Sequence, residues 1–298
     1  MRLHPPLVRL ASLALVAASI ATHAQTGAPA VQDWSAVEQA LGRPGAALPG
    51  GVMRFKFPRL DLKVVVGDVP VLPPLALTGW VSFLPTSDGT LVLGDLVLTL
   101  LEVAPVTHAL EQGGIFITAS HDHLLGETPR LTFVHLMARG DTTAIAKTIH
   151  DAIALSGTPL TLPPSTQGAL AYPLDTAAIA RALGAPGRIE GGVYQTSVPR
   201  ASAPTFAGLT LPPGMGVATA INIEPVDSTF VVAAGDFVVT AAESQAVVEA
   251  LAAHGVTVTA VHAHFAGSTP ALLFVHFWVK DSARRVTDGL REALAAAK

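Results

Sequence analysis

The sequence predicts an α+β protein made of two homologous units, each a mainly antiparallel sheet with helices packed on one face. Three observations predict it: an internal duplication, apolar stretches of strand length joined by short turns, and helix caps that recur in both copies. The chain has 298 residues, of which 50% are hydrophobic and 13% are charged, so it can bury a large core. We expect the two units to be related by a pseudo-two-fold axis, as identical subunits are in C2 dimers.

The duplication is visible as matched blocks at a nearly constant spacing. Residues 114–141 align with residues 255–282 without a gap, and 12 of these 28 positions are identical. Other blocks recur 141 or 142 residues later, as Leu41-Gly42 does in Leu183-Gly184 and Gly94-Asp95 in Gly235-Asp236. A period of this length, seen twice, indicates paired units rather than a solenoid. We place the units at 31–156 and 173–298, with a proline-rich linker at 157–172.

Within the first unit, the elements follow from the apolar pattern, the helix caps and the turn residues. Gly42 ends the first helix, and a capping box of Thr99 and Glu102 begins the second. Thr240 and Glu243 repeat this box, so we interpret both glutamates as caps in preference to metal ligands. The expected elements are a helix at 34–41, strands at 52–57, 61–66, 79–84 and 91–100, a helix ending at 113, strands at 115–124 and 131–139, and a helix at 141–155, with 282–297 as its counterpart.

Residues 1–24 have the order of a secretory signal peptide. Arg2 and Arg9 precede an apolar run at 10–21, and Ala24 supplies a small residue before the expected cleavage site. A membrane anchor is the alternative, but the run is shorter than the ~20 residues that a membrane-spanning helix needs. We therefore expect a bacterial periplasmic or secreted protein, cleaved after Ala24, with no membrane span in the mature chain.

Composition excludes several classes of function. The chain has no cysteine, which removes disulfides, thiolate nucleophiles, cysteine-ligated zinc and iron–sulfur clusters. Its net charge is −4 and it contains no basic run, so we expect no nucleic-acid partner. The sequence motifs of serine hydrolases, zinc metalloproteases, phosphate-binding loops and dinucleotide-binding folds do not occur. Any chemistry must use histidines, carboxylates, hydroxyls or the backbone.

Six histidines form one pattern that occurs in both copies: His121, His123 and His135 correspond to His262, His264 and His276. Residues i and i+2 of a strand point to the same face, so His121 and His123 should project together. If the following connection turns around Thr128, His135 lies opposite His121 on the neighbouring strand. Three imidazoles would then converge in each copy.

Three neutral imidazoles at this spacing suit a divalent transition metal such as Zn²⁺, Cu²⁺, Ni²⁺ or Fe²⁺. Glu127 is a candidate additional ligand or acid/base, although Ser268 replaces it in the second copy. The alternative is structural, because the strand face that carries His121 also carries Ile115 and Ile117. Buried histidines that bond to backbone or to one another would produce the same pattern. No catalytic residue can be assigned.

Two other pairs of recurring polar residues have two interpretations each. Asp95 and Asp236 follow glycines in matched strands, where they could orient an imidazole or form a bulge or turn. Arg59 and Arg200 each follow a proline, and could bind an anion or lie at a solvated sheet edge.

Several motifs together resemble the LppY/LpqO-type family, the domain of unknown function 1259. They are Trp34-x-x-Val37-Glu38-x-x-Leu41-Gly42-Arg43, Pro58-Arg59-x-Asp61-Leu62, Gly94-Asp95-Leu96-Val97 and the segment 117–131, which carries His121 and His123. The resemblance covers nearly all of the expected mature chain and implies two tandem units in a secreted or lipid-anchored bacterial protein. Because this chain has no cysteine to acylate, we expect a soluble form. The resemblance implies no reaction, cofactor or catalytic residue.

Three classes of function remain open. The first is a secreted or periplasmic ligand-binding protein whose histidine clusters hold a transition metal for storage, sensing or structure. The second is a metal-dependent hydrolase that acts on a cell-envelope substrate with metal-bound water as nucleophile. The third is a metal-free binding scaffold. An enzyme needs a further acid or base, for which Glu127 is the candidate, so whether the protein is an enzyme stays open, as does its oligomeric state.

We predict that the exported protein begins at Gln25, because the charged start, the apolar run and Ala24 direct cleavage to the preceding bond. The intact mass of protein recovered from the periplasm or the medium should equal that of residues 25–298. A mass that includes Met1 would contradict the signal peptide.

Overall fold

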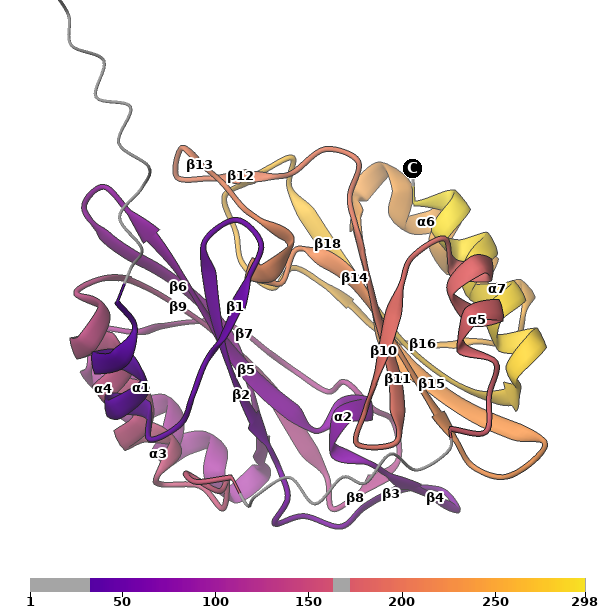
Figure 1. The fold of residues 1–298 in the computed structure, drawn as a ribbon, viewed down its shortest axis with the longest axis horizontal. Coiled ribbons are helices and arrows are strands. Elements are labelled where there is room, and N and C mark those ends of the chain that lie inside the picture. Colours follow the sequence, from indigo (N-terminus) through magenta and orange to yellow (C-terminus); the bar gives the residue numbers. More distant parts are fainter. Residues whose placement is uncertain (1–32, 163–171, 298) are drawn as a thin grey trace, which may run out of the picture. The chain divides into compact units, whose positions relative to one another are not determined.

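Two copies of one antiparallel α+β unit make up the part of the chain that the computed structural model describes, residues 33–162 and 172–297 (Figure 1). The predicted fold class and the duplication are confirmed. The expected signal peptide and residues 163–171 of the expected linker lie outside the described residues.

The first copy contains one large and one small sheet. The large sheet has the strand order β1-β2-β5-β6-β9-β7, the small sheet has the order β4-β3-β8, and all neighbouring strands are antiparallel. The elements are α1 (Ser35–Leu41), β1 (Ala46–Leu48), β2 (Val52–Pro58), β3 (Val64–Val66), β4 (Val69–Val71), α2 (Pro73–Ala76), β5 (Thr78–Thr86), β6 (Gly89–Thr99), α3 (Leu100–Gln112), β7 (Phe116–His121), β8 (Glu127–Thr128), β9 (Leu131–Gly140) and α4 (Thr142–Ile153).

The second copy repeats this order, with a 3₁₀ turn in place of α2. Its large sheet has the order β10-β11-β14-β15-β18-β16 and its small sheet β13-β12-β17. The elements are α5 (Thr176–Leu183), β10 (Gly187–Glu190), β11 (Val193–Pro199), β12 (Thr205–Phe206), β13 (Leu209–Thr210), η1 (Pro213–Met215), β14 (Ala218–Pro225), β15 (Phe230–Thr240), α6 (Ala241–Ala253), β16 (Thr257–His262), β17 (Ser268–Thr269), β18 (Leu272–Ser282) and α7 (Ala283–Ala296).

The helices begin and end where the sequence predicts their caps. Both capping boxes form, with Glu102 accepting the backbone N–H of Thr99 and Glu243 that of Thr240. Gly42 ends α1 in the left-handed conformation at φ 68°, which glycine adopts without steric cost. The interpretation of both glutamates as caps is therefore confirmed.

Two expected strands are shorter than predicted, because tertiary contacts interrupt them. The strand expected at 61–66 covers only 64–66, since a turn at Arg59 to Leu62 directs the Asp61 carboxylate back to the Arg59 guanidinium. The strand expected at 115–124 ends at His121, because the chain then leaves the large sheet and residues 127–128 pair with β3.

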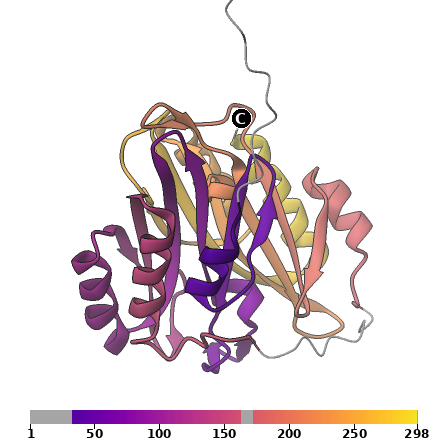
Figure 2. The same ribbon diagram turned by 60° about the vertical axis from the view of Figure 1, so that its left-hand side comes forward.

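Each large sheet has helices on one face and the other copy on its opposite face, as Figures 1 and 2 show. One apolar core joins α1, α3 and α4 to the first sheet, and a second joins α5, α6 and α7 to the second sheet. Two further cores contain residues of both copies: Val97 and Phe133 pack with Val232, and Leu93 packs with Val238 and Phe274. Both faces of the central strands are therefore buried.

Equivalent residues make the same contact in both directions between the copies. The Arg54 guanidinium on β2 donates to the carbonyl of Gly214 in η1 at 2.8 Å. The Gln195 amide, at the equivalent place on β11, donates to the carbonyl of Pro74 in α2 at 2.7 Å. This reciprocity is what a pseudo-two-fold relation requires.

Arg59 and Arg200 are held inside the fold by carboxylates. Arg59, whose side chain is 1% exposed, donates to Asp61, to Glu102 and to the carbonyl of Val97. Arg200 donates to Glu243 and to the carbonyl of Val238. Each arginine therefore connects a strand to the start of a helix, and neither interpretation left open by the sequence, anion binding or a solvated sheet edge, applies.

We predict that Arg59→Met destabilises the protein by about 3–5 kcal/mol, because it leaves two carboxylates facing a buried apolar side chain. Arg200→Met is the matched control in the other copy. It should cost less, since Arg200 pairs with one carboxylate and its side chain is 13% exposed. Urea unfolding of both variants measures the difference, and an equal or smaller loss for Arg59→Met would contradict this account.

Glu243 should give stability a measurable pH dependence. Its hydrogen bonds with Arg200, and with the backbone and hydroxyl of Thr240, lower its pKa from 4.5 to about 2. The contribution is therefore present above pH 4.5 and is lost as the pH falls towards 2. The free energy of unfolding of wild type minus that of Glu243→Gln should shrink over this range. Glu249→Gln, at an exposed position of α6, should show no such trend.

Candidate metal centre between the two copies

The six histidines of the repeated pattern meet in one cluster between the two large sheets. The ring centroids of His121 and His262 are 4.0 Å apart, those of His123 and His276 4.5 Å, and those of His135 and His264 3.7 Å. Each of these pairs joins the two copies. The sequence favoured one convergent group per copy, whereas the structure builds one composite cluster.

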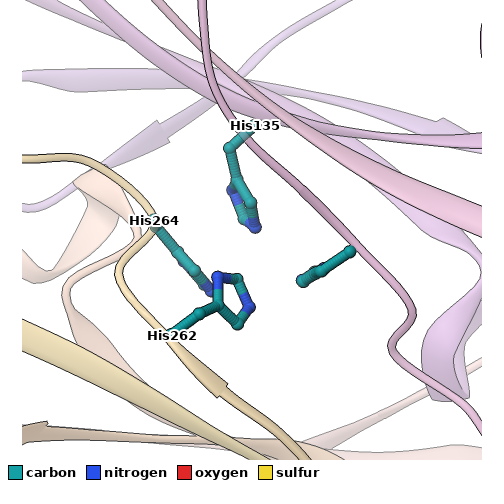
Figure 3. A group of neighbouring side chains, drawn as sticks. His135, His262 and His264 are labelled. Atoms are coloured by element: carbon teal, nitrogen blue, oxygen red, sulfur yellow. The ribbon is translucent and has the colours of Figure 1, made fainter.

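Figure 3 shows His135 on the first copy facing His262 and His264 of the second, with the three side chains directed toward one another. One phenylalanine from each of the two mixed apolar cores flanks the cluster. Phe133 lies 4.7 Å from His123, and its counterpart Phe274 stacks on His264 at 3.4 Å, both between ring centroids.

Strand register places the histidines differently from the prediction. In β7 and β9, Ala119 is opposite His135 and His121 is opposite Phe133, so the pairing is shifted by two residues. The second copy has the same register, with Ala260 opposite His276. The predicted pairing of His121 with His135 is therefore wrong. Because side chains alternate with a period of two, an even shift leaves the histidines on the expected face.

The nitrogen atoms of the cluster are poorly satisfied by one another. His276 Nε2 lies 2.9 Å from His262 Nε2 and 3.1 Å from His264 Nε2. An imidazole nitrogen carries one lone pair or one proton, so it can satisfy one of these two contacts. Within the described residues, five buried imidazole nitrogens of the cluster have no hydrogen-bond partner: both of His121, Nδ1 of His123, Nε2 of His135 and Nδ1 of His276. Such orphaned groups are costly unless something else binds them.

Two groups of nitrogens are close enough to share a cation. One consists of His121, His135, His262 and His264, the other of His121, His123 and His276, and within each group the ligand atoms lie within 4.8 Å of one another. Tetrahedral ligands at the usual zinc–nitrogen length are about 3.3 Å apart, so binding requires a modest contraction. His121 belongs to both groups.

Glu127 belongs to neither group. Its side chain is buried, and Oε1 accepts the backbone N–H of Leu131, which closes the loop between β8 and β9. The structure therefore gives Glu127 a local role in that loop. Ser268 occupies the equivalent buried place in the second copy.

Burial keeps the imidazoles in the form that binds metals. Desolvation, reinforced by neighbouring imidazoles, lowers the pKa of His121 to about 3, and chiefly desolvation lowers that of His123 to about 4. The same cause lowers the pKa of the other four histidines. The rings are therefore neutral at pH 7, and metal coordination requires the neutral ring.

A cavity of about 440 Å³ adjoins the cluster and is lined by both copies. His123, His264 and His276 reach it from the cluster, and Asp95 and Asp236 form part of the same wall. Burial raises the pKa of Asp236 to about 7 and that of Asp95 well above its usual value.

The recurring aspartates lie beside the histidines on their sheets. Asp95 is directly opposite His135 in the strand register, and Asp236 is opposite His276. The preceding glycine allows neighbouring strands to approach, because a Cβ on Gly235 would lie 1.9 Å from the carbonyl oxygen of Ala220. The strand register is continuous at both aspartates, so neither forms a bulge or turn. Within the described residues, no hydrogen bond joins either carboxyl group to an imidazole, and Asp95 Oδ1 has no partner.

Sequence reasoning missed the cations of the cavity wall. Arg54 and Lys56 on β2 and Arg188 on β10 line it. Their counterparts in the other copy are Gln195, Ser197 and Ala46, so no repeat marks them. The i, i+2 spacing of Arg54 and Lys56 on one strand is the signal that was available.

Comparison with known proteins gives a family but no activity. The family model described as Domain of Unknown Function (DUF1259) matches residues 35–155 and again residues 177–296. No curated protein matches the chain. No helix in the described residues is long and apolar enough to cross a membrane.

Three solved structures are similar only at a low level. The trimeric bacterial microcompartment shell protein PduB is 12% identical over 85% of this chain and 89% of that one, with a TM-score of 0.21. EtuB from Clostridium kluyveri is 9% identical over the same shares, also with a TM-score of 0.21. A structure described as that of an unknown protein from Galdieria sulphuraria is 11% identical over 69% of this chain and 89% of that one, with a TM-score of 0.19. Likeness at this level supports no argument about function.

Proposed function

Because the chain belongs to the DUF1259 family, whose description names no reaction, its function has to be inferred from the site, and we propose that it binds a divalent transition metal at the histidine cluster shared by its two copies. The observation that carries the proposal is the convergence of six histidines, five of whose buried ring nitrogens have no hydrogen-bond partner within the described residues. A cation would satisfy several of these nitrogens at once.

The donor set indicates the class of metal. Both groups consist of imidazoles alone, and no carboxylate oxygen contributes to either among the described residues. Imidazole suits zinc, copper, nickel and iron, whereas calcium and magnesium prefer oxygen ligands. The proposal is therefore a site for one of these transition metals.

The structural alternative fits less well. Buried histidines that serve only packing should find partners in the backbone or in one another. His262 does, since its Nδ1 lies 3.1 Å from the carbonyl oxygen of Ala263. His121 does not, because both of its ring nitrogens lack a partner within the described residues. A structural role leaves this cost unexplained.

A metal-dependent hydrolase is the second candidate, favoured by the cavity beside the cluster. Hydrolysis at a metal needs an acid or base near the substrate. Asp95 and Asp236 meet that need better than Glu127, because they line the cavity. When bound, the metal would supply Lewis-acid chemistry, and the two carboxyl groups would hold or transfer protons at their Oδ atoms.

The proposed location is the bacterial periplasm or the cell exterior. It is supported by the charged start, the apolar run and the cleavage site in residues 1–24. A metal-binding protein in this compartment would meet transition metals that enter the cell envelope.

We predict that untagged protein, purified and loaded with Zn²⁺, retains at least one equivalent after dialysis, and that His121→Ala lowers the affinity more than any other single histidine substitution. His121 is the ligand common to both groups. Loss of a direct ligand should cost at least the ~10–100-fold that loss of an outer partner costs. Elemental analysis and competitive titration with a chromophoric chelator measure both quantities.

His135→Ala and His276→Ala each remove a ligand from one group and should leave the other able to bind. His108→Ala is the control, because His108 lies on α3 and bonds to Gln112. It should bind as wild type does. Wild-type protein that retains none of the four metals after reconstitution would overturn the proposal in favour of a metal-free binding scaffold.

A further inference from the structure

Three cations gather on one wall of the cavity between the copies. Arg54 and Lys56 project from β2 of the first copy, and Arg188 lies on β10 of the second. Glu190 pairs with two of them, at 2.6 Å from Lys56 Nζ and 3.2 Å from Arg188 Nη2. Glu190 thus pairs with Lys56 and Arg188 but not with Arg54.

Arg54 has no ion-pair partner among the described residues. Its Nε donates to Ser82 Oγ and its Nη2 to the carbonyl of Gly214, both at 2.8 Å. Its guanidinium carbon lies 4.2 Å from the centroid of the Trp80 ring. These contacts are with neutral groups, and no hydrogen bond within the described residues engages Nη1. The carboxyl group of Asp236, which also lines the cavity, interacts electrostatically with Arg54 but forms no ion pair with it in the described part of the chain.

The other enclosed arginines are treated differently. Arg59 and Arg200 each pair with carboxylates. Arg43 also has no carboxylate partner within the described residues, but its guanidinium donates hydrogen bonds to the carbonyls of Lys56, Pro159 and Leu160. It does not line the cavity. An enclosed charge is costly without an ion-pair partner, so an arginine that faces a cavity with no such partner is suited to a bound anion.

The position of Arg54 also breaks the symmetry of the cavity. The aspartates and histidines of the cavity recur in both copies, but Arg54 does not. Gln195 occupies the equivalent place in the second copy, and its amide donates to the carbonyl of Pro74. A ligand with one anionic end would therefore bind in one orientation. The volume of about 440 Å³ lies in the range of small-molecule sites.

We propose that this cavity binds a small organic molecule through an oxyanion, a carboxylate or a phosphate, that pairs with Arg54. Lys56 and Arg188 add positive potential at the same wall, and Trp80 holds the guanidinium plane. The site does not require a metal, although a ligand anchored here lies in the cavity that His123, His264 and His276 also reach.

Isothermal titration of the full chain with succinate and with inorganic phosphate tests the proposal, in a low-salt buffer free of other oxyanions. Wild type should bind at least one probe with a dissociation constant below about 10 mM. Arg54→Gln, which introduces the residue type found at the equivalent place in the other copy, should weaken binding about tenfold or more, because a charge-assisted hydrogen bond is lost. Preference for one probe identifies the anionic group.

Arg139→Gln is the matched control. It removes one positive charge at an exposed site, where Arg139 pairs with Asp88, and should change affinity less than about twofold, as distant exposed charges are screened. Arg54→Lys keeps the positive charge but loses the planar guanidinium that can donate two parallel hydrogen bonds. This variant should bind the probe more weakly than wild type and more tightly than Arg54→Gln. It also provides the comparison if Arg54→Gln does not fold.

The titrations are made on chelator-treated and on Zn²⁺-loaded protein. Oxyanion binding without metal retention supports this inference alone, and metal retention without oxyanion binding supports the proposed function alone. Absence of binding of both probes by wild type, or equal affinities for wild type and the Arg54 variants, would overturn the inference.

Discussion

The buried contact between the two large sheets is the constraint on which the rest of the structure depends. Each sheet already covers one face with helices, so its central strands are enclosed on both sides, as the nearly continuous burial of β6 and β15 shows. A polar side chain on the inner face loses water and must find a partner there. The histidine cluster lies on that inner face, which accounts both for its neutral imidazoles and for their unsatisfied nitrogens.

Local chemistry decides which parts of the fold the sequence can predict. The capping boxes of α3 and α6 depend on residues three apart, and both formed as expected. The pairing of β7 with β9 depends instead on the excursion after His121, in which β8 pairs with β3 of the small sheet. No local pattern encodes that contact. The resulting error was two residues, so the face of the histidines was predicted correctly and their opposite neighbours were not.

The composite cluster could not be predicted from the repeated pattern, because it depends on how the two copies pack against each other. That packing is set by the mixed apolar cores around Phe133 and Phe274, whose residues are distant in the sequence. Comparison of the copies also finds only what they share. It marked the histidines and Asp95 and Asp236, and it passed over Arg54, because the equivalent residue is Gln195.

Divergence between the copies has made the two halves of a symmetric cavity unequal. His121 and His262 are equivalent by sequence, yet His121 belongs to both groups of candidate ligands and His262 to one. His262 bonds to its own chain at Ala263, where the first copy has Asp122, which pairs with Arg130. Arg54, the unpaired cation, also belongs to the first copy. The candidate ligand common to both groups and the cation without an ion pair thus come from one copy, while the second copy supplies the opposing wall. A duplicated fold that retained full symmetry would offer two equivalent half-sites, whereas this one would present different groups to the two ends of a bound molecule.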